Sequence, residues 1–109
     1  MVASISPTQL VDVLSSPNAQ LIDVRDYDEW ADGHLEGARS VPLDILRADP
    51  ERELSRDGAL VFVCAKGTRS LTAAKLAERF GYQQIYNVAG GTAACARAGF
   101  ALVAARAAA

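Results

Sequence analysis

The 109-residue sequence lacks the residues on which several common protein classes depend. Its two cysteines, Cys64 and Cys95, are too few and too oddly spaced for the disulfide framework of a small secreted domain. With His34 as its one histidine, the chain does not offer the ligands of an ordinary zinc site. We therefore expect neither a bound metal nor a cofactor.

A surplus of positive charge and long apolar stretches are also missing. The chain has 11 Lys and Arg against 13 Asp and Glu, so nothing in its composition favours binding to nucleic acid phosphates. No stretch approaches the roughly 20 apolar residues that a membrane span needs. Residues 1–14 do not have the basic, apolar and cleavage regions of a signal peptide. We expect a cytoplasmic protein that binds neither nucleic acid nor membranes.

The rest of the sequence alternates between strand-like and helix-like segments. Half of the residues are hydrophobic, which is enough for one core, and the length suits a single domain over residues 1–109. Short apolar runs predict strands, and helically spaced apolar residues with Ser, Pro or Gly at their ends predict helices. The predicted strands are residues 20–24, 40–42, 59–63, 85–88 and 100–103. The predicted helices begin at Ser6-Pro7, cover 28–31, 43–46 and 70–80, and follow Gly90-Gly91; residues 47–57 read as charged surface, and the 105–109 tail as frayed.

This order of elements predicts an α/β fold. Strands separated by helices of 10 to 15 residues form crossover units, which build a parallel sheet. The segment 59–63 is apolar on both faces, as a strand at the centre of such a sheet should be. We expect a central, mostly parallel sheet of about five strands, with helices on both faces.

The stretch VFVCAKGTRS contains the main candidate site. Cys64 directly follows the central strand, and ligands of open α/β sheets bind beyond the carboxyl ends of the strands. Gly67 allows a tight turn, and the next helix aims its free amides at the loop. These amides, with Lys66 and Arg69 on the rim, should lower the pKa of Cys64 and bind anions. The alternative is that Cys64 merely packs in the core, but packing does not require a cationic, glycine-containing loop.

Four segments follow one another along nearly the whole chain: LIDVR with YDEW (21–25, 27–30), GHLEGA (33–38), CAKGTRS (64–70) and YNVAGG (86–91). Each segment alone is weak evidence, but all four in this order and at these separations are specific. Together they resemble single-domain rhodaneses, the sulfurtransferase family. The resemblance implies a three-layer rhodanese-like fold.

The resemblance also implies a ping-pong transfer of sulfur. In the family, the loop cysteine takes the outer sulfur of a donor such as thiosulfate, becomes a persulfide, and passes the sulfur to an acceptor such as cyanide or a thiol. Cys64 occupies the position of that nucleophile. The implied anion-binding groups are those of the loop and one strand end: Ala65, Lys66, Gly67, Thr68, Arg69, Ser70 and Asp23.

Loop length separates this interpretation from its closest rival. A phosphatase and arsenate-reductase branch of the same fold has a loop one residue longer, with arginine six positions after the cysteine. Here Arg69 lies five positions after Cys64, so phosphatase chemistry is disfavoured. The positive charges of Lys66 and Arg69 suit an anionic donor such as thiosulfate, although cationic rims also attract protein partners.

Asp23, Arg25 and His34 are supporting residues with ordinary structural alternatives. Asp23 could orient a loop amide or a basic side chain, and Arg25 could pair with Glu29 or Asp28; for both, a structural ion pair is the alternative to a role in catalysis. His34 matches the family's Gly-His-x-x-Gly-Ala turn, where it is mainly architectural.

Cys95 departs from the family pattern, which usually has tryptophan at this position. The simpler account is a small apolar residue in an alanine-rich helix. The other is a second thiol that resolves or accepts sulfur near the site.

Two functions other than a free-standing enzyme stay open. The chain could be a sulfur-relay carrier that exchanges a persulfide with a sulfur-acceptor protein, or a rhodanese-like binding module. The intact cysteine loop argues against the second. We expect a monomer or a weak homodimer.

Overall fold

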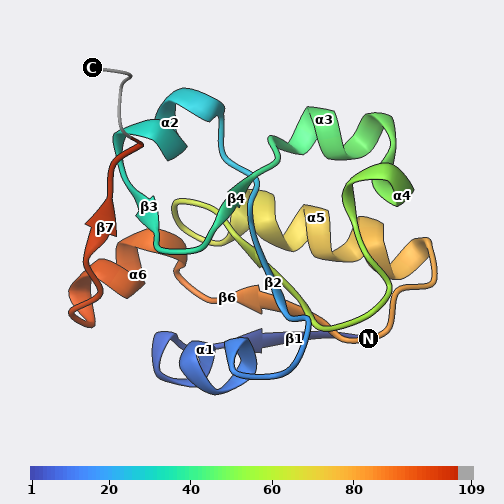
Figure 1. Ribbon diagram of the computed structural model, residues 1–109, viewed down its shortest axis with the longest axis horizontal. Coiled ribbons are helices and arrows are strands. Elements are labelled where there is room, and N and C mark those ends of the chain that lie inside the picture. Colours follow the sequence, from blue (N-terminus) through green and yellow to red (C-terminus); the bar gives the residue numbers. More distant parts are fainter. Residues whose placement is uncertain (106–109) are drawn as a thin grey trace.

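The computed structural model describes residues 1–105 and contains short strands and helices in alternation (Figure 1). The predicted tail beyond Ala105 lies outside the described residues. The strands are β1 (Val2–Ile5), β2 (Gln20–Asp23), β3 (His34–Leu35), β4 (Arg39–Ser40), β5 (Leu60–Val63), β6 (Ile85–Val88) and β7 (Leu102–Val103). The helices are α1 (Pro7–Leu14), α2 (Tyr27–Asp32), α3 (Leu43–Ala48), α4 (Pro50–Glu53), α5 (Thr68–Arg79) and α6 (Gly91–Arg97).

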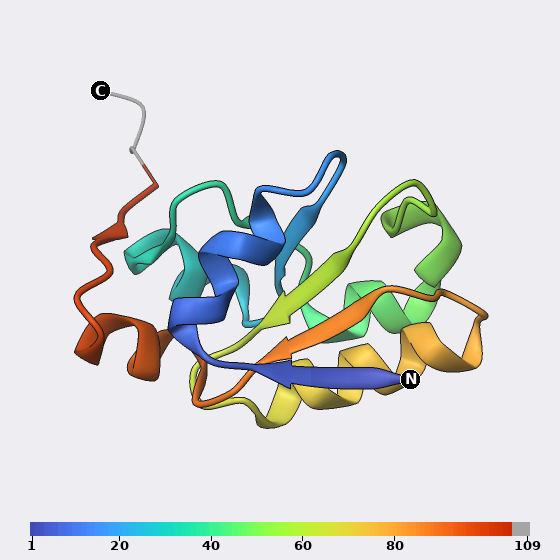
Figure 2. The ribbon, with the colours of Figure 1, turned by 90° about the horizontal axis from the view of Figure 1, so that it is seen from below.

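Five of the strands form one parallel sheet in the order β1-β6-β5-β2-β4. Figure 2 shows the arrowheads of β1, β6 and β5 pointing in the same direction. The predicted central strand, β5, is the middle of the five. The expected α/β fold with about five parallel strands is therefore confirmed.

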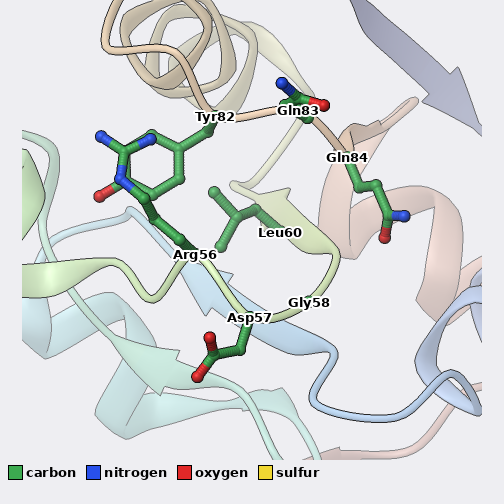
Figure 3. A pocket seen from close by; sticks show the side chains of 7 residues that line it. All are labelled: Arg56, Asp57, Gly58, Leu60, Tyr82, Gln83 and Gln84. Atoms are coloured by element: carbon green, nitrogen blue, oxygen red, sulfur yellow. The ribbon is translucent and has the colours of Figure 1, made fainter.

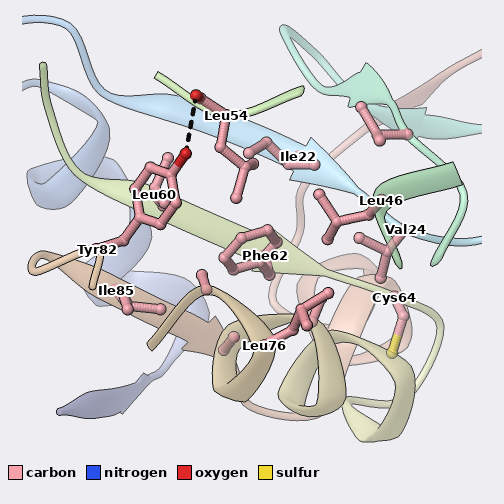
Figure 4. Close-up of a cluster of buried hydrophobic side chains, with 14 residues drawn as sticks. Ile22, Val24, Leu46, Leu54, Leu60, Phe62, Cys64, Leu76, Tyr82 and Ile85 are labelled. Carbon is pink, nitrogen blue, oxygen red and sulfur yellow. Dashed lines mark hydrogen bonds between the residues drawn. The ribbon is translucent and has the colours of Figure 1, made fainter. Parts of the chain in front are cut away.

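Helices cover both faces of this sheet and enclose two clusters of buried side chains. Successive residues of a strand point to opposite faces. Leu60 and Phe62 accordingly face α5 and α3, whereas Val61 and Val63 face α1 and α6. Figure 4 shows the first cluster between the sheet and a helix, with Cys64 at its edge. In Figure 1, α1 and α5 lie on opposite sides of β1 and β6.

Local signals explain where two of the helices begin. Ser6 caps α1: its side chain accepts from the amide of Gln9, whose side chain accepts in return from the amide of Ser6, and Pro7 occupies the first helical turn. Helix α5 begins at Thr68, two residues before the predicted start. Its N-cap is Gly67, which has a left-handed backbone conformation and turns the chain directly into the helix.

Two parts of the strand pattern differ from the prediction. The first strand, β1, was not predicted; it lies at the sheet edge, and its central residues Ala3 and Ser4 are exposed, so it has no apolar run. The predicted last strand exists as β7, but it pairs antiparallel in a separate ribbon with β3, which was not predicted either. None of the helices in residues 1–105 combines the length and apolar character needed to cross a membrane.

Candidate active site

The candidate site lies at the carboxyl edge of the parallel sheet. Strand β5 ends at Val63, β6 at Val88 and β2 at Asp23, and parallel pairing brings these ends to the same edge. The loops that follow carry Cys64, the turn before α6, and the start of α2. Segments far apart in sequence therefore meet around one thiol.

The thiol of Cys64 receives hydrogen bonds from its own loop. The backbone amide of Gly67 donates to Sγ at 3.1 Å and that of Ser70 at 3.3 Å. The hydroxyl of Ser70 lies 3.3 Å from the same sulfur. Cys64 is 1% exposed and belongs to the buried cluster that packs against α5, so water competes little for these hydrogen-bond donors.

Opposing effects act on the pKa of Cys64, and the net result is a lowered pKa. Burial raises it, because a thiolate loses hydration. The Ser70 hydroxyl, followed by the amides of Ser70, Gly67 and Lys66, lowers it by stabilising the charged sulfur. The direction matches the expectation from the sequence.

A buried polar pair behind the sulfur was not anticipated from the sequence. The Ser70 hydroxyl donates to Oδ1 of Asn87 at 2.5 Å, and both residues are buried. A hydroxyl has one proton, so it donates either to Asn87 or to a thiolate. The Asn87 amide can partner both arrangements, since its oxygen accepts and its nitrogen donates. In the arrangement that the structure shows, Asn87 positions the Ser70 hydroxyl beside Sγ, and donating to a thiolate would require the Asn87 amide to turn over.

Helix α6 holds the outside of the cysteine loop. The amide of Thr92 donates to the carbonyl of Cys64 at 2.8 Å, and the amide of Ala93 donates to the carbonyl of Ala65 at 3.1 Å. This contact requires glycine at position 91, where φ is +61° and a Cβ would lie 2.2 Å from the carbonyl oxygen of Cys64. The carbonyls of Cys64 and Ala65 are thus held by α6, while the amides of Gly67 and Ser70 point toward the sulfur.

The two cations of the loop differ in their surroundings. Arg69 makes a two-pronged ion pair with Glu29 of α2, with N–O distances of 2.7 and 3.1 Å. Lys66 is exposed, and its ammonium group has no ion pair or hydrogen bond within residues 1–105. Both residues, with Cys64, Ala65 and Thr68, line a pocket of about 280 Å³.

Asp23 lies fully buried at the end of β2 and binds Arg25. Its carboxylate accepts from the Arg25 amide at 3.0 Å and from the guanidinium at 2.8 to 3.2 Å. Arg25 also donates to the carbonyl of Gly33 at 2.6 Å. The expected pairing of Arg25 with Glu29 or Asp28 is wrong, because Asp23 holds Arg25 and Arg69 holds Glu29. Substrate binding by Asp23 stays a prediction.

His34 and Cys95 have structural surroundings. The ring of His34 stacks on Trp30 with centroids 4.1 Å apart, and its Nδ1 lies 2.8 Å from the Trp30 carbonyl, consistent with the architectural role expected of it. Cys95 is fully buried on the α1 face of the sheet, whereas Cys64 packs on the α5 face. Burial raises the pKa of Cys95, which disfavours a reactive thiolate there.

A larger cavity of about 370 Å³ lies away from Cys64 (Figure 3). It opens at the amino edge of the sheet, where β5 begins at Leu60 and Gln84 precedes β6. Its wall includes Arg56, whose guanidinium lies 4.0 Å above the centre of the Tyr82 ring. This wall has no nucleophile of the kind that Cys64 provides. Within residues 1–105, no three His, Cys, Asp or Glu side chains gather as a metal would require.

The arrangement can stabilise a charged sulfur without a general base. The amides already point at Sγ, so they need no reorganisation when the thiol ionises or when a second sulfur is attached. The loop residues named from the sequence, 64–70, come together around the pocket or the sulfur. Glu29 and Asn87 were not named as site residues, because their contacts join distant parts of the chain; the one available signal was their place in the quoted segments 27–30 and 86–91.

Comparison with known proteins agrees with this geometry. The family described as "Rhodanese-like domain" matches residues 6–98. The chain is 34% identical to human thiosulfate:glutathione sulfurtransferase over 100 residues, which cover 80% of this chain and 87% of that protein. It is 40% identical over 73 residues to the uncharacterized protein YqhL of Bacillus subtilis (strain 168), covering 67% of this chain but only 57% of that protein. A rhodanese-related protein of Thermoplasma volcanium superposes with a TM-score of 0.82 at 27% identity, covering 93% of this chain and 97% of that one.

Proposed function

The chain belongs to the rhodanese-like domain family, and from that premise we propose that it is a sulfurtransferase in which Cys64 carries sulfane sulfur as a persulfide. The observation that carries the proposal is the ring of donors around Sγ: two loop amides and the Ser70 hydroxyl. These groups stabilise a negative charge on sulfur in the thiolate and in the persulfide alike.

The proposed reaction has two half-reactions. In the first, the Cys64 thiolate attacks the outer sulfur of thiosulfate; a new S–S bond forms, the S–S bond of the donor breaks, and sulfite leaves with the electron pair. In the second, an acceptor attacks the outer sulfur of the persulfide and the Cys64 thiolate leaves. With cyanide as acceptor, the product is thiocyanate. No redox partner is needed, because each step exchanges one bond to sulfur for another.

An anionic donor suits the pocket, whose wall includes Lys66 with its free ammonium group. Thiosulfate is the donor that we propose. A thiol acceptor is suggested by the human relative, whose name gives thiosulfate and glutathione. A sulfur-acceptor protein is the alternative, in which case the domain serves as a relay.

The test is the intact mass of the protein, measured without reductant before and after exposure to thiosulfate. We expect Cys64 to gain one sulfur atom, which cyanide then removes as thiocyanate. The Cys95→Ser variant should behave as the unmodified protein, and Cys64→Ser should gain nothing. Sulfur gained by Cys64→Ser would refute the assignment.

Turnover distinguishes the enzyme from the relay. A persulfide that forms readily but passes slowly to cyanide and glutathione would favour a relay to a partner protein. Rapid release of thiocyanate or glutathione persulfide would favour the free-standing enzyme. Absence of any sulfur gain from thiosulfate would remove thiosulfate as the donor.

A further inference from the structure

The ion pair between Arg69 and Glu29 changes the charge that the pocket presents to a donor. Arg69 lines the pocket together with Cys64, but both of its terminal nitrogens bind the Glu29 carboxylate. The same carboxylate accepts a hydrogen bond from the amide of Asp26 at 3.1 Å, so the helix start holds it in place. Hydrogen bonding to Arg69 keeps the pKa of Glu29 below its ordinary value, and the carboxylate is charged at neutral pH.

A second carboxylate adds to this effect. Asp26 is the N-cap of α2, and its charge raises the pKa of Arg69 further, after the hydrogen bond and charge of Glu29 and the charge of Cys64. Two cations, Lys66 and Arg69, therefore line the pocket, while Glu29 binds Arg69 from outside the lining and the charge of Asp26 also acts on Arg69. Of these two cations, Lys66 alone has no charged partner within residues 1–105. A dianion meets much less positive charge here than the loop sequence alone indicates.

We propose that Glu29 determines charge specificity: it weakens the binding of doubly charged sulfur donors relative to singly charged ones. This inference rests on the proposed sulfur transfer at Cys64. Singly charged donors of the same chemistry are thiosulfonates and organic persulfides, which also bear a terminal sulfur that can be transferred. The structure thus assigns to α2 a part in donor choice that the cysteine loop alone does not have.

Coulomb's law sets the size of the effect. A unit charge at a distance on the order of 8 Å, in largely aqueous surroundings, alters the binding of a monoanion about threefold. The interaction doubles for a dianion, so the same charge alters its binding about tenfold. Removing the charge of Glu29 should therefore raise the preference for thiosulfate over a monoanion about threefold. Salt should reduce this change, because the mouth is open to solvent.

The test compares thiosulfate with benzenethiosulfonate in Glu29→Gln. Benzenethiosulfonate is a monoanion that gives its outer sulfur to Cys64 and leaves as benzenesulfinate. Glutamine keeps the helix cap at Asp26, since Glu and Gln both serve at this position. In a ping-pong reaction, kcat/KM for the donor reports the first half-reaction alone. We expect kcat/KM to rise about tenfold for thiosulfate and about threefold for benzenethiosulfonate.

Glu36→Gln is the matched control. Glu36 is exposed, lies beside a separate apolar pocket that includes Leu10 and Leu35, and loses the same charge on substitution. It should leave the ratio of the two kcat/KM values unchanged. An unchanged ratio in Glu29→Gln, with both donors active, would overturn the inference about Glu29.

Alkylation of Cys64 tests the same inference without any sulfur transfer. Iodoacetate is an anion and iodoacetamide is neutral, and both alkylate the thiolate with loss of iodide. Any change in thiolate fraction affects both rates equally and cancels in their ratio. Glu29→Gln should raise the iodoacetate to iodoacetamide ratio about threefold. If neither donor loads Cys64 but this ratio rises, the proposed function fails while the charge role of Glu29 stands; an unchanged ratio contradicts that role.

Discussion

Replacing Ser70 by alanine tests directly how the loop activates Cys64. The substitution removes the hydroxyl at 3.3 Å from Sγ and leaves the amide of residue 70, which also donates to the sulfur, in place. It therefore deletes one of three donors without removing the loop backbone. Because the lost hydroxyl stabilises the thiolate, the pKa of Cys64 should rise.

The size of the effect follows from the hydrogen bond that is lost. A hydrogen bond to a charged group contributes about 1.5 to 3 kcal/mol, and the lower end applies because the hydroxyl is shared with Asn87. About 1.5 kcal/mol corresponds to roughly a tenfold smaller thiolate fraction at a pH below the pKa. The assay is the rate of iodoacetamide alkylation as a function of pH. Ser70→Ala should react about tenfold more slowly at low pH, and the two rates should converge where both thiols are ionised.

Two further variants show whether the hydroxyl is the cause. Ser70→Thr keeps a hydroxyl and should restore most of the rate. Thr72→Ala removes an exposed hydroxyl of α5 that bonds only the Thr68 carbonyl, and it should leave the profile unchanged. Circular dichroism must show folded protein, since Asn87 loses its partner at a cost of about 1 to 3 kcal/mol. If the pH profile of the alkylation rate were the same in Ser70→Ala as in the unmodified protein, the Ser70 hydroxyl would not lower the pKa of Cys64.

Three other substitutions probe the surroundings of the site. Gly91→Ala places a Cβ against the Cys64 carbonyl at a positive φ. Urea titration should show that the free energy of unfolding falls by roughly 1 to 3 kcal/mol, and thiocyanate formation should fall as well. Gly37→Ala is the control, because Gly37 also has a positive φ but lies in open space, and it should keep activity. Asp23→Asn breaks a buried ion pair and should lower the unfolding free energy by about 3 to 5 kcal/mol in the same titration. Lys66→Ala removes the unpaired cation of the pocket. In steady-state kinetics it should raise KM for thiosulfate several-fold and leave kcat little altered. An unchanged KM would contradict the argument that the charge of Lys66 attracts an anionic donor.

Sequence patterns predict two kinds of element: strands that are buried on both faces of the sheet, and helices that bury one apolar face. Strand β5 is apolar throughout because both helical layers cover it, and α5 shows helical spacing because one face packs on the sheet. The edge strand β1 could not be predicted in this way. It pairs with β6 alone, and because only its end residues, Val2 and Ile5, pack against the core while the two between them are exposed, it has no run of buried apolar side chains to mark it.

The same distinction holds for the candidate site. The cysteine loop is local: Cys64, Gly67 and Ser70 lie within seven residues, so the sequence alone indicates both the turn and the amides that face the sulfur. The pairing of Arg69 with Glu29 spans 40 positions and depends on how α2 sits beside α5. The sequence alone therefore predicts Arg69 as a cation on the rim of the loop, and only the folded arrangement shows that its charge is paired with Glu29.

The cysteine loop works as an anion site because a distant segment fixes its polarity. A peptide group has a donor at one end and an acceptor at the other, so loop amides can face the sulfur only if the loop carbonyls find donors elsewhere. The first amides of α6 are such donors, because they bind the carbonyls of Cys64 and Ala65. The Ala65 carbonyl shares its peptide group with the Lys66 amide, which helps to lower the pKa of Cys64. Glycine at position 91 permits the close approach. The segment 86–91 thus contributes to the site twice: through Asn87 behind the Ser70 hydroxyl, and through the turn that brings α6 against the loop. A substitution in the segment 86–91 should therefore reduce the reactivity of Cys64, even though none of the residues that line the pocket has changed.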